Sequence, residues 1–182
     1  MRKIIIIIIL VGVTVLFYAM RNDFSVNDTG TSVVSENGVF RPDPSNATFT
    51  FDDGLITLSA GRNERSLTPG SARTEETVLM DEFAYGDINR DGKDDTLLLL
   101  ARYGAGSGTF IYVAAFVSGP VTYRGSRTFF IGDRIAPQSI SINGETVIVK
   151  YLDRGPDEAL AAEPTVQMSK QFIYKNGELV EK

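Results

Sequence analysis

The chain has 182 residues, of which 43% are hydrophobic and 10% aromatic, so it can form one folded domain with its own core. It contains no cysteine and no histidine, which excludes disulfides, Ser-His-Asp and Cys-His nucleophile systems, and zinc sites built on these residues. Three of its 18 cationic residues precede position 22 and all 23 acidic residues follow it, so the remainder carries a formal charge of -8. Such a surface repels nucleic acid and attracts cations, and we expect no nucleic-acid partner.

The N-terminal stretch MRKIIIIIILVGVTVLFYAM, residues 1–20, places Arg2 and Lys3 before 17 uncharged residues, 4–20. This length suits a transmembrane helix and also the apolar region of a secretory signal. A signal-peptide cleavage site needs small residues at the first and third positions before the cut, and Ala19 is preceded by bulky residues. We therefore predict an uncleaved signal anchor that holds the chain in the cell membrane through residues 4–20, with secretion after cleavage as the alternative. By the positive-inside rule, the C-terminal part then lies outside the cytoplasm.

The next segment, residues 21–46, is rich in Asn, Asp, Ser, Gly and Pro and has few large apolar side chains. This composition predicts a flexible tether. From Ala47 onward the sequence shows alternating apolar runs, so we predict a folded extracytoplasmic domain over residues 47–182.

Turn residues recur about every 8 to 14 residues in this domain, and the runs between them alternate in polarity or are short and apolar. Asp-Gly at 53–54 and Asn-Gly at 143–144 and 176–177 predict β-hairpins. The glycine-rich stretch 104–108 lacks the Lys-Ser/Thr ending of a nucleotide loop and predicts another hairpin connection. TLLLLARY, residues 96–103, has the pattern of a strand buried on both faces. The sequence thus predicts an all-β domain, a single antiparallel sandwich or partly open barrel.

The most informative motif is GDINRDGKDDTLLLL, residues 86–100. Counted from Asp87 as position 1, side-chain oxygens fall at positions 1, 3, 5 and 9, which are Asp87, Asn89, Asp91 and Asp95. A glycine at position 6 permits a sharp turn, and the backbone carbonyl of Lys93 occupies position 7. Oxygen ligands at this spacing suit a hard cation, and Ca²⁺ fits better than Mg²⁺, which prefers a smaller octahedral shell with more water.

This spacing resembles the DxNxDGxxD loops of EF-hand-like calcium binders, including the dockerin and integrin-type FG-GAP families. An EF-hand has a glutamate at position 12 and continues into a helix, whereas Leu98 stands here and the chain continues into an apolar strand. The FG-GAP version is therefore more similar, and the resemblance implies one Ca²⁺ held by Asp87, Asn89, Asp91, Lys93 and Asp95. We expect its role to be structural because no base or nucleophile is near in sequence. The alternative is a solvated Asn-Asp-Gly turn without metal.

A second polar stretch, LDRGPDE at 152–158, gathers Asp153, Asp157 and Glu158 around a Gly-Pro turn. Paired carboxylates catalyse glycoside hydrolysis when their separation and pKa values are suitable, and the sequence fixes neither. A carboxylate-dependent hydrolase of the cell envelope is therefore an alternative function. Inhibition of an extracellular enzyme through the loop 104–108 is another.

Several segments, taken in order, resemble a group of small bacterial exported or membrane-anchored proteins without an assigned activity. These segments are ATFTF, LITL, GDINRDGKDDTLLLL, GSGTFIYVAA, GDRIAPQ, LDRGPDE, EPTV and NGELVE. The resemblance implies export and a compact β domain. We therefore expect a membrane-anchored envelope domain that holds one calcium ion. We expect this domain to be a binding module for an unidentified protein or small ligand rather than an enzyme.

Overall fold

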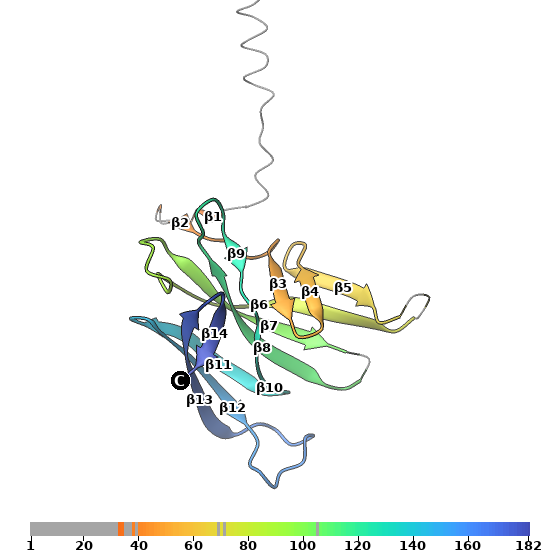
Figure 1. Ribbon diagram of the computed structural model, residues 1–182. Helices are drawn as coiled ribbons and strands as arrows, with labels where there is room; N and C mark the ends of the chain where they lie inside the picture. The colour runs from red at the N-terminus through yellow and green to blue at the C-terminus, as the bar shows by residue number, and fades with distance from the viewer. Residues whose placement is uncertain (1–32, 35–37, 39, 69, 71, 105) are drawn as a thin grey trace, which may run out of the picture.

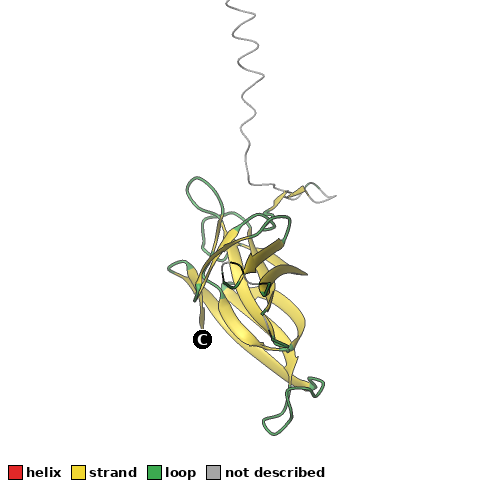
Figure 2. Cartoon of the chain, turned by 90° about the vertical axis from the view of Figure 1, so that its right-hand side faces the viewer, coloured by secondary structure: helices red, strands yellow, loops and turns green. Residues whose placement is uncertain are grey.

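The computed structural model describes residues 33, 34, 38, 40–68, 70, 72–104 and 106–182. This part of the chain consists of strands and loops, with no helix (Figure 2). The strands are β1 (Val33–Val34), β2 (Phe40–Arg41), β3 (Thr48–Phe51), β4 (Gly54–Thr57), β5 (Arg62–Ser66), β6 (Thr74–Gly86), β7 (Asp95–Tyr103), β8 (Thr109–Val117), β9 (Arg124–Gly125), β10 (Phe129–Asp133), β11 (Ala136–Asn143), β12 (Thr146–Asp153), β13 (Val166–Lys175) and β14 (Glu178–Glu181).

The strands pair in an antiparallel manner into two main sheets (Figure 1). One sheet has the order β10-β8-β7-β6-β5, with the short β9 also paired to β8, and the other has the order β11-β12-β13-β14. The pairs β3-β4 and β1-β2 complete the set. Isolated parallel bridges join Arg127 to Thr50 of β3 and to Glu178 of β14, so one residue connects the β3-β4 hairpin with the second sheet. The prediction of an all-β, antiparallel domain is confirmed.

Strand β7 lies in the middle of this arrangement, and its alternate side chains point to different partners. Leu97 and Leu99 belong to the larger buried cluster, formed with β8 and the sheet β11–β14. Leu98 and Leu100 belong to a second cluster, formed with the β3-β4 hairpin. The predicted strand with two buried faces is therefore confirmed, because each face of β7 is covered by a different layer.

The turn signals also agree with the structure. Asp52-Asp53 joins β3 to β4, Gly144-Glu145 joins β11 to β12 directly after Asn143, and Asn176-Gly177 joins β13 to β14. β7 pairs with β8 directly across the glycine-rich stretch, from Tyr103 opposite Thr109. A close approach adds one constraint: a Cβ at Gly125 would lie 2.2 Å from the carbonyl oxygen of Thr48, so only glycine fits where β9 crosses β3.

The C-terminal end of the predicted tether lies against the domain. Pro42 accepts a buried hydrogen bond of 2.6 Å from the hydroxyl of Thr96, and the guanidinium of Arg41 lies 4.1 Å from the centre of the Tyr85 ring. Phe40 packs beside Tyr123. The predicted anchor, residues 1–20, and the tether up to residue 32 lie outside the described residues. Where the structure describes the chain, no helix has the length and apolarity needed to cross a membrane.

Candidate metal centre

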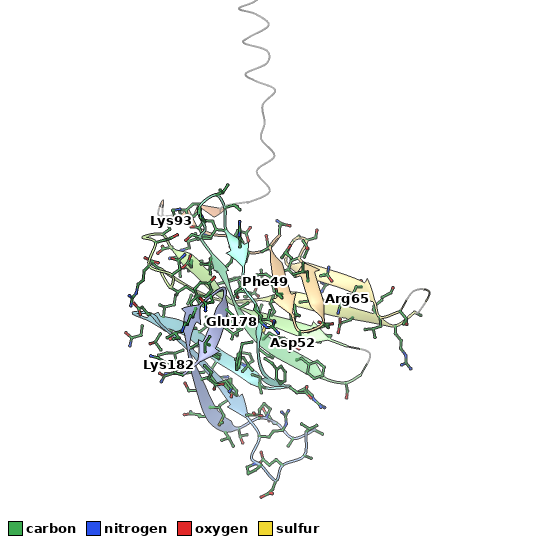
Figure 3. All side chains as sticks on the ribbon, viewed as in Figure 1. Phe49, Asp52, Arg65, Lys93, Glu178 and Lys182 are labelled. Carbon is green, nitrogen blue, oxygen red and sulfur yellow. The ribbon has the colours of Figure 1, made fainter. Side chains whose placement is uncertain are left out.

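The acidic loop joins the end of β6 to the start of β7, and it turns sharply. Arg90 and Gly92 adopt left-handed backbone conformations with φ values of 64° and 84°. Glycine adopts this conformation without steric cost, which is the reason for a glycine at the sixth position of such a loop. The upper end of the domain carries this loop, where Lys93 is labelled in Figure 3.

The first three side chains of the motif fold inward over the loop's own backbone. The Asp87 carboxylate accepts hydrogen bonds from the backbone N–H groups of Asp91, at 3.1 Å, and Gly92, at 2.8 Å. The side-chain oxygen of Asn89 accepts from Asp91 N–H at 3.0 Å, and Asp91 accepts from Lys93 N–H at 3.0 Å. The sequence-predicted residues Asp87, Asn89 and Asp91 are thus brought together in one turn.

Ser118, which directly follows β8, ties this turn to the neighbouring connection. Its hydroxyl donates to Asp91 Oδ2 at 2.5 Å, while Asn89 Nδ2 donates to the Ser118 carbonyl at 3.0 Å. The Ser118 hydrogen bond is the main reason that the pKa of Asp91 lies below its usual value. Sequence reasoning missed Ser118, because it lies 27 residues beyond Asp91 and only the pairing of β7 with β8 brings the two together.

Asp95 differs from the other carboxylates of the motif because it is completely buried, with 0% exposure. Its oxygens accept hydrogen bonds from the backbone N–H groups of Ser118, at 2.8 Å, and Ile88, at 3.0 Å. Burial raises its pKa, and the two backbone hydrogen bonds act in the opposite direction. No cation among the described residues forms an ion pair with it. The domain therefore buries a carboxylate at this point without supplying a countercharge.

The fit of a metal ion depends on donor chemistry and on the buried charge. Carboxylate, amide and carbonyl oxygens are the ligands that Ca²⁺ prefers, and the uncompensated charge of Asp95 favours a cation nearby. Within the part of the chain that the structure describes, no three acidic, histidine or cysteine side chains form a group that could hold a metal ion. Asp95 accepts from the backbone N–H groups of Ile88 and Ser118, Asp91 accepts from the Ser118 hydroxyl and from Lys93 N–H, and Asp87 accepts from N–H groups of the turn. The oxygen ligands of the loop therefore suit a hard cation in their chemistry, and in this structure they accept hydrogen bonds from backbone N–H groups and from the Ser118 hydroxyl.

The other predicted carboxylates are used to shape a loop. Asp153 accepts from the backbone N–H of Arg154 at 2.8 Å, and Glu158 accepts from the N–H of Gly155 at 2.7 Å. Arg154 also donates to the carbonyl oxygens of Ala162 and Arg134. These contacts fix the β12–β13 connection against the turn between β10 and β11.

A second charged cluster, which the sequence did not indicate, lies at the opposite end of β7. The guanidinium of Arg102, a residue only 7% exposed, donates to the carboxylates of Asp53 and Glu75, and Arg65 donates to the same two acids. The hydrogen bond from Arg102 is the main reason that the pKa of Asp53 lies far below its usual value. Burial by itself would lower the pKa of Arg102, but the hydrogen bonds to Asp53 and Glu75 outweigh it and raise that pKa. The signal that could have indicated this cluster is the position of Arg102 within the apolar run 96–103, because a buried arginine needs acidic partners.

Comparison with known proteins adds no family to this description. No protein-family model matches the chain, and no curated protein and no solved structure shows significant similarity to it.

Proposed function

We propose that the chain is a membrane-anchored binding module outside the cytoplasm, whose β domain, of the sandwich type, is stabilised by one Ca²⁺ in the Asp87–Asp95 loop. The observation that carries the calcium part is Asp95. Taking a carboxylate out of water is costly unless a cation or several hydrogen bonds compensate it. Two backbone N–H groups satisfy part of this need, and a divalent cation at the loop supplies the missing charge.

The side-chain oxygens of Asp87, Asn89, Asp91 and Asp95 and the carbonyl of Lys93 are the ligands in this proposal. The bound ion supplies positive charge that draws these oxygens together and fixes the turn. Because Asp95 begins the central strand β7 and also holds Ser118 after β8, the ion stabilises the pairing of two core strands. The role is structural, since the loop offers oxygen ligands but neither histidine nor cysteine.

Support for the binding role comes from the loop carboxylates and from the charge of the surface. Asp153 and Glu158 accept hydrogen bonds from backbone N–H groups of their own loop, so they serve to shape that loop. The acidic surface and the apolar residues 4–20 support an anchored position outside the cytoplasm.

Thermal melting of the full chain in detergent micelles, with Ca²⁺, Mg²⁺ or chelator, tests the calcium site. At free Ca²⁺ 100 times its dissociation constant, binding to the native state adds about 2.7 kcal/mol, and the melting temperature rises accordingly. Asp91→Asn abolishes the rise, whereas Asp94→Asn, which removes the same charge from an even-numbered position of the loop, retains it. A melting temperature that ignores the chelator, or equal responses in the two variants, would contradict the site.

The topology has a separate test, because the chain lacks cysteine. Single cysteines placed as Lys3→Cys or Lys182→Cys are treated, in bacterial cells with a permeable outer envelope, with a maleimide that cannot cross the cytoplasmic membrane. We expect labelling of the variant at position 182 and none at position 3. The reverse pattern would contradict the proposed orientation.

A further inference from the structure

The second sheet has a free edge that β14 covers only in part. β14 pairs with β13 from Phe172 to Lys175, and Lys182, which follows β14, donates its N–H to the carbonyl of Gln171 at 2.9 Å. The residues before Gln171, 166–170, pair only with β12 among the described strands. Figure 1 shows β14 as a short strand beside the longer β13.

The hydrogen bond of Gln171 also sets the direction in which the free backbone groups point. Backbone groups of alternate residues in a strand face the same side. Because the backbone groups of Gln171 face β14, the N–H and C=O groups of Ser169 and Gln167 face the same side, where no described strand pairs with them. Relative to the described residues, the edge therefore offers the donors and acceptors of two residues to an added strand.

The side chains along this edge are accessible. Residues 166–169 are all exposed, including Val166 at 41% and Met168 at 44%. Met168 is paired with the inward-facing Tyr151, so its side chain points to the same face of the sheet as the core. A residue of an added strand opposite Met168 would face this apolar side and would favour an apolar side chain.

A pocket of about 450 Å³ lies beside the edge, and it is lined by Gln138, Lys150, Tyr151, Leu152, Gln167, Met168 and Ser169. Lys150 stands directly opposite Ser169, and Leu152 opposite Gln167. Lys150 is exposed and forms no ion pair with any residue that the structure describes. It is the charged residue of the pocket lining.

The small side chain of Ser169 makes this lysine available to the edge. Adjacent strands lie about 4.8 Å apart, so a residue added opposite Ser169 is roughly 10 Å from the backbone of Lys150, within the combined reach of a lysine and a glutamate across a serine. An acidic side chain at that position pairs with Lys150, and the residue next to it packs against Met168.

Resting on the proposed role as a binding module, we propose that the free edge of β13 at residues 166–170 binds an extended peptide as an added strand, with an acidic residue opposite Ser169 and apolar neighbours. The backbone groups of Gln167 and Ser169 supply the hydrogen bonds, and Lys150 supplies the preference for acid.

The probe is a labelled peptide, Val-Thr-Val-Glu-Val-Thr-Val, whose binding to the full chain in detergent micelles is followed by fluorescence anisotropy. We expect it to bind at least tenfold more tightly than the same peptide with Lys in place of Glu. Lys150→Glu reverses the order of the two peptides, whereas Lys175→Glu, an exposed lysine farther along β13, changes neither affinity more than twofold.

Two N-methylated peptides test the added strand without altering the protein. A methyl group on the Glu nitrogen removes the N–H that would face β13 and abolishes binding, whereas a methyl group on the next Val nitrogen, which faces away, leaves the affinity within about threefold. Equal binding of the two methylated peptides, or equal binding of the Glu and Lys peptides, would overturn the proposal. Self-association of the chain without peptide binding would also overturn it, because the occupant would then be a second copy. The rise of the melting temperature with Ca²⁺ is measured in the same samples and tests the proposed metal site independently. A failure of peptide binding can therefore be distinguished from a failure of the calcium proposal.

Discussion

The two ends of β7 bury opposite charges in opposite ways. Asp95, the first residue of the strand, is an anion that accepts hydrogen bonds from the backbone N–H groups of Ile88 and Ser118 and forms no ion pair with the described residues. Arg102, near the other end, is a cation that two carboxylates neutralise. The Arg102 end is electrically complete within the domain, whereas the Asp95 end depends on hydrogen bonds or on a cation from solution. Figure 3 shows the separation, with Lys93 of the acidic loop labelled at the upper left and Arg65, which belongs to the Arg102 cluster, at the right.

The largest loss of stability is expected at the Arg102 end of β7. Arg102→Met keeps the apolar part of the side chain and removes the guanidinium, which takes the buried cation away from both Asp53 and Glu75 and leaves the more exposed Arg65 as their remaining partner. We expect the free energy of unfolding in urea to fall by about 3 kcal/mol. Arg62→Met is the matched control, because its ion pair with Glu76 is largely exposed and contributes at most about 1 kcal/mol. Similar losses in both variants would contradict the picture of a buried, self-sufficient cluster.

A smaller effect is expected from the hydroxyl that ties the acidic loop to β8. Ser118→Ala removes the donor to Asp91 and leaves the backbone bond to Asp95 intact. In chelator we expect a loss of stability smaller than that of Arg102→Met, because a hydrogen bond to a charged group is stronger than a neutral one but this carboxylate is exposed to solvent, which weakens it. Chemical denaturation measures it, and an unchanged midpoint would show that the loop and β8 are not coupled through this contact.

Asp95→Asn removes the buried charge and preserves the shape of the side chain. Relief of the buried charge opposes the loss of one acceptor, so in chelator we expect stability within about 1 kcal/mol of the wild type. The stabilisation by Ca²⁺ disappears in the same variant. A loss in chelator as large as that of Arg102→Met would mean that the charge of Asp95 is already compensated, and the contrast between the two ends would fail.

The pH dependence separates the two ends by sign. The pKa of Asp53 is lowered by Arg102, so its contribution is present above its unfolded value near 3.8 and is lost as the pH falls below it. The pKa of Asp95 is raised by burial, so its ionised form destabilises the native state at higher pH, and this is relieved as the pH falls towards 3.8. Melting temperatures are measured in chelator from pH 7 down to pH 3. As the pH falls, those of the wild type and Asp95→Asn should become equal before pH 3.8 is reached, whereas those of the wild type and Asp53→Asn should become equal only below pH 3.8. Convergence of both pairs in the same range would contradict these assignments.

Several elements could be predicted from the sequence because their signals are local. Asp-Gly and Asn-Gly pairs favour the backbone conformations of tight turns, and the unbroken apolar run of β7 requires cover on both faces. The left-handed Gly92 and the inward turn of Asp87, Asn89 and Asp91 also follow from local spacing. In contrast, residues 40–46 have the composition of a tether, and their packing against Tyr85 and Thr96 of β7 depends on partners 44 and 54 residues away, which composition does not reveal.

What the sequence by itself determined is the strand content, the turns and the oxygen spacing of the acidic loop, since these depend on neighbours within a few residues. The tertiary structure decided which layer covers each face of β7, that Asp95 is buried between Ile88 of the loop and Ser118, and that Arg102 meets Asp53 and Glu75. It also decided that β14 pairs with β13 from Phe172 to Lys175. The physical reason is that burial, charge compensation and free edges depend on segments brought together by strand pairing across long stretches of chain, and no single stretch of sequence contains both partners.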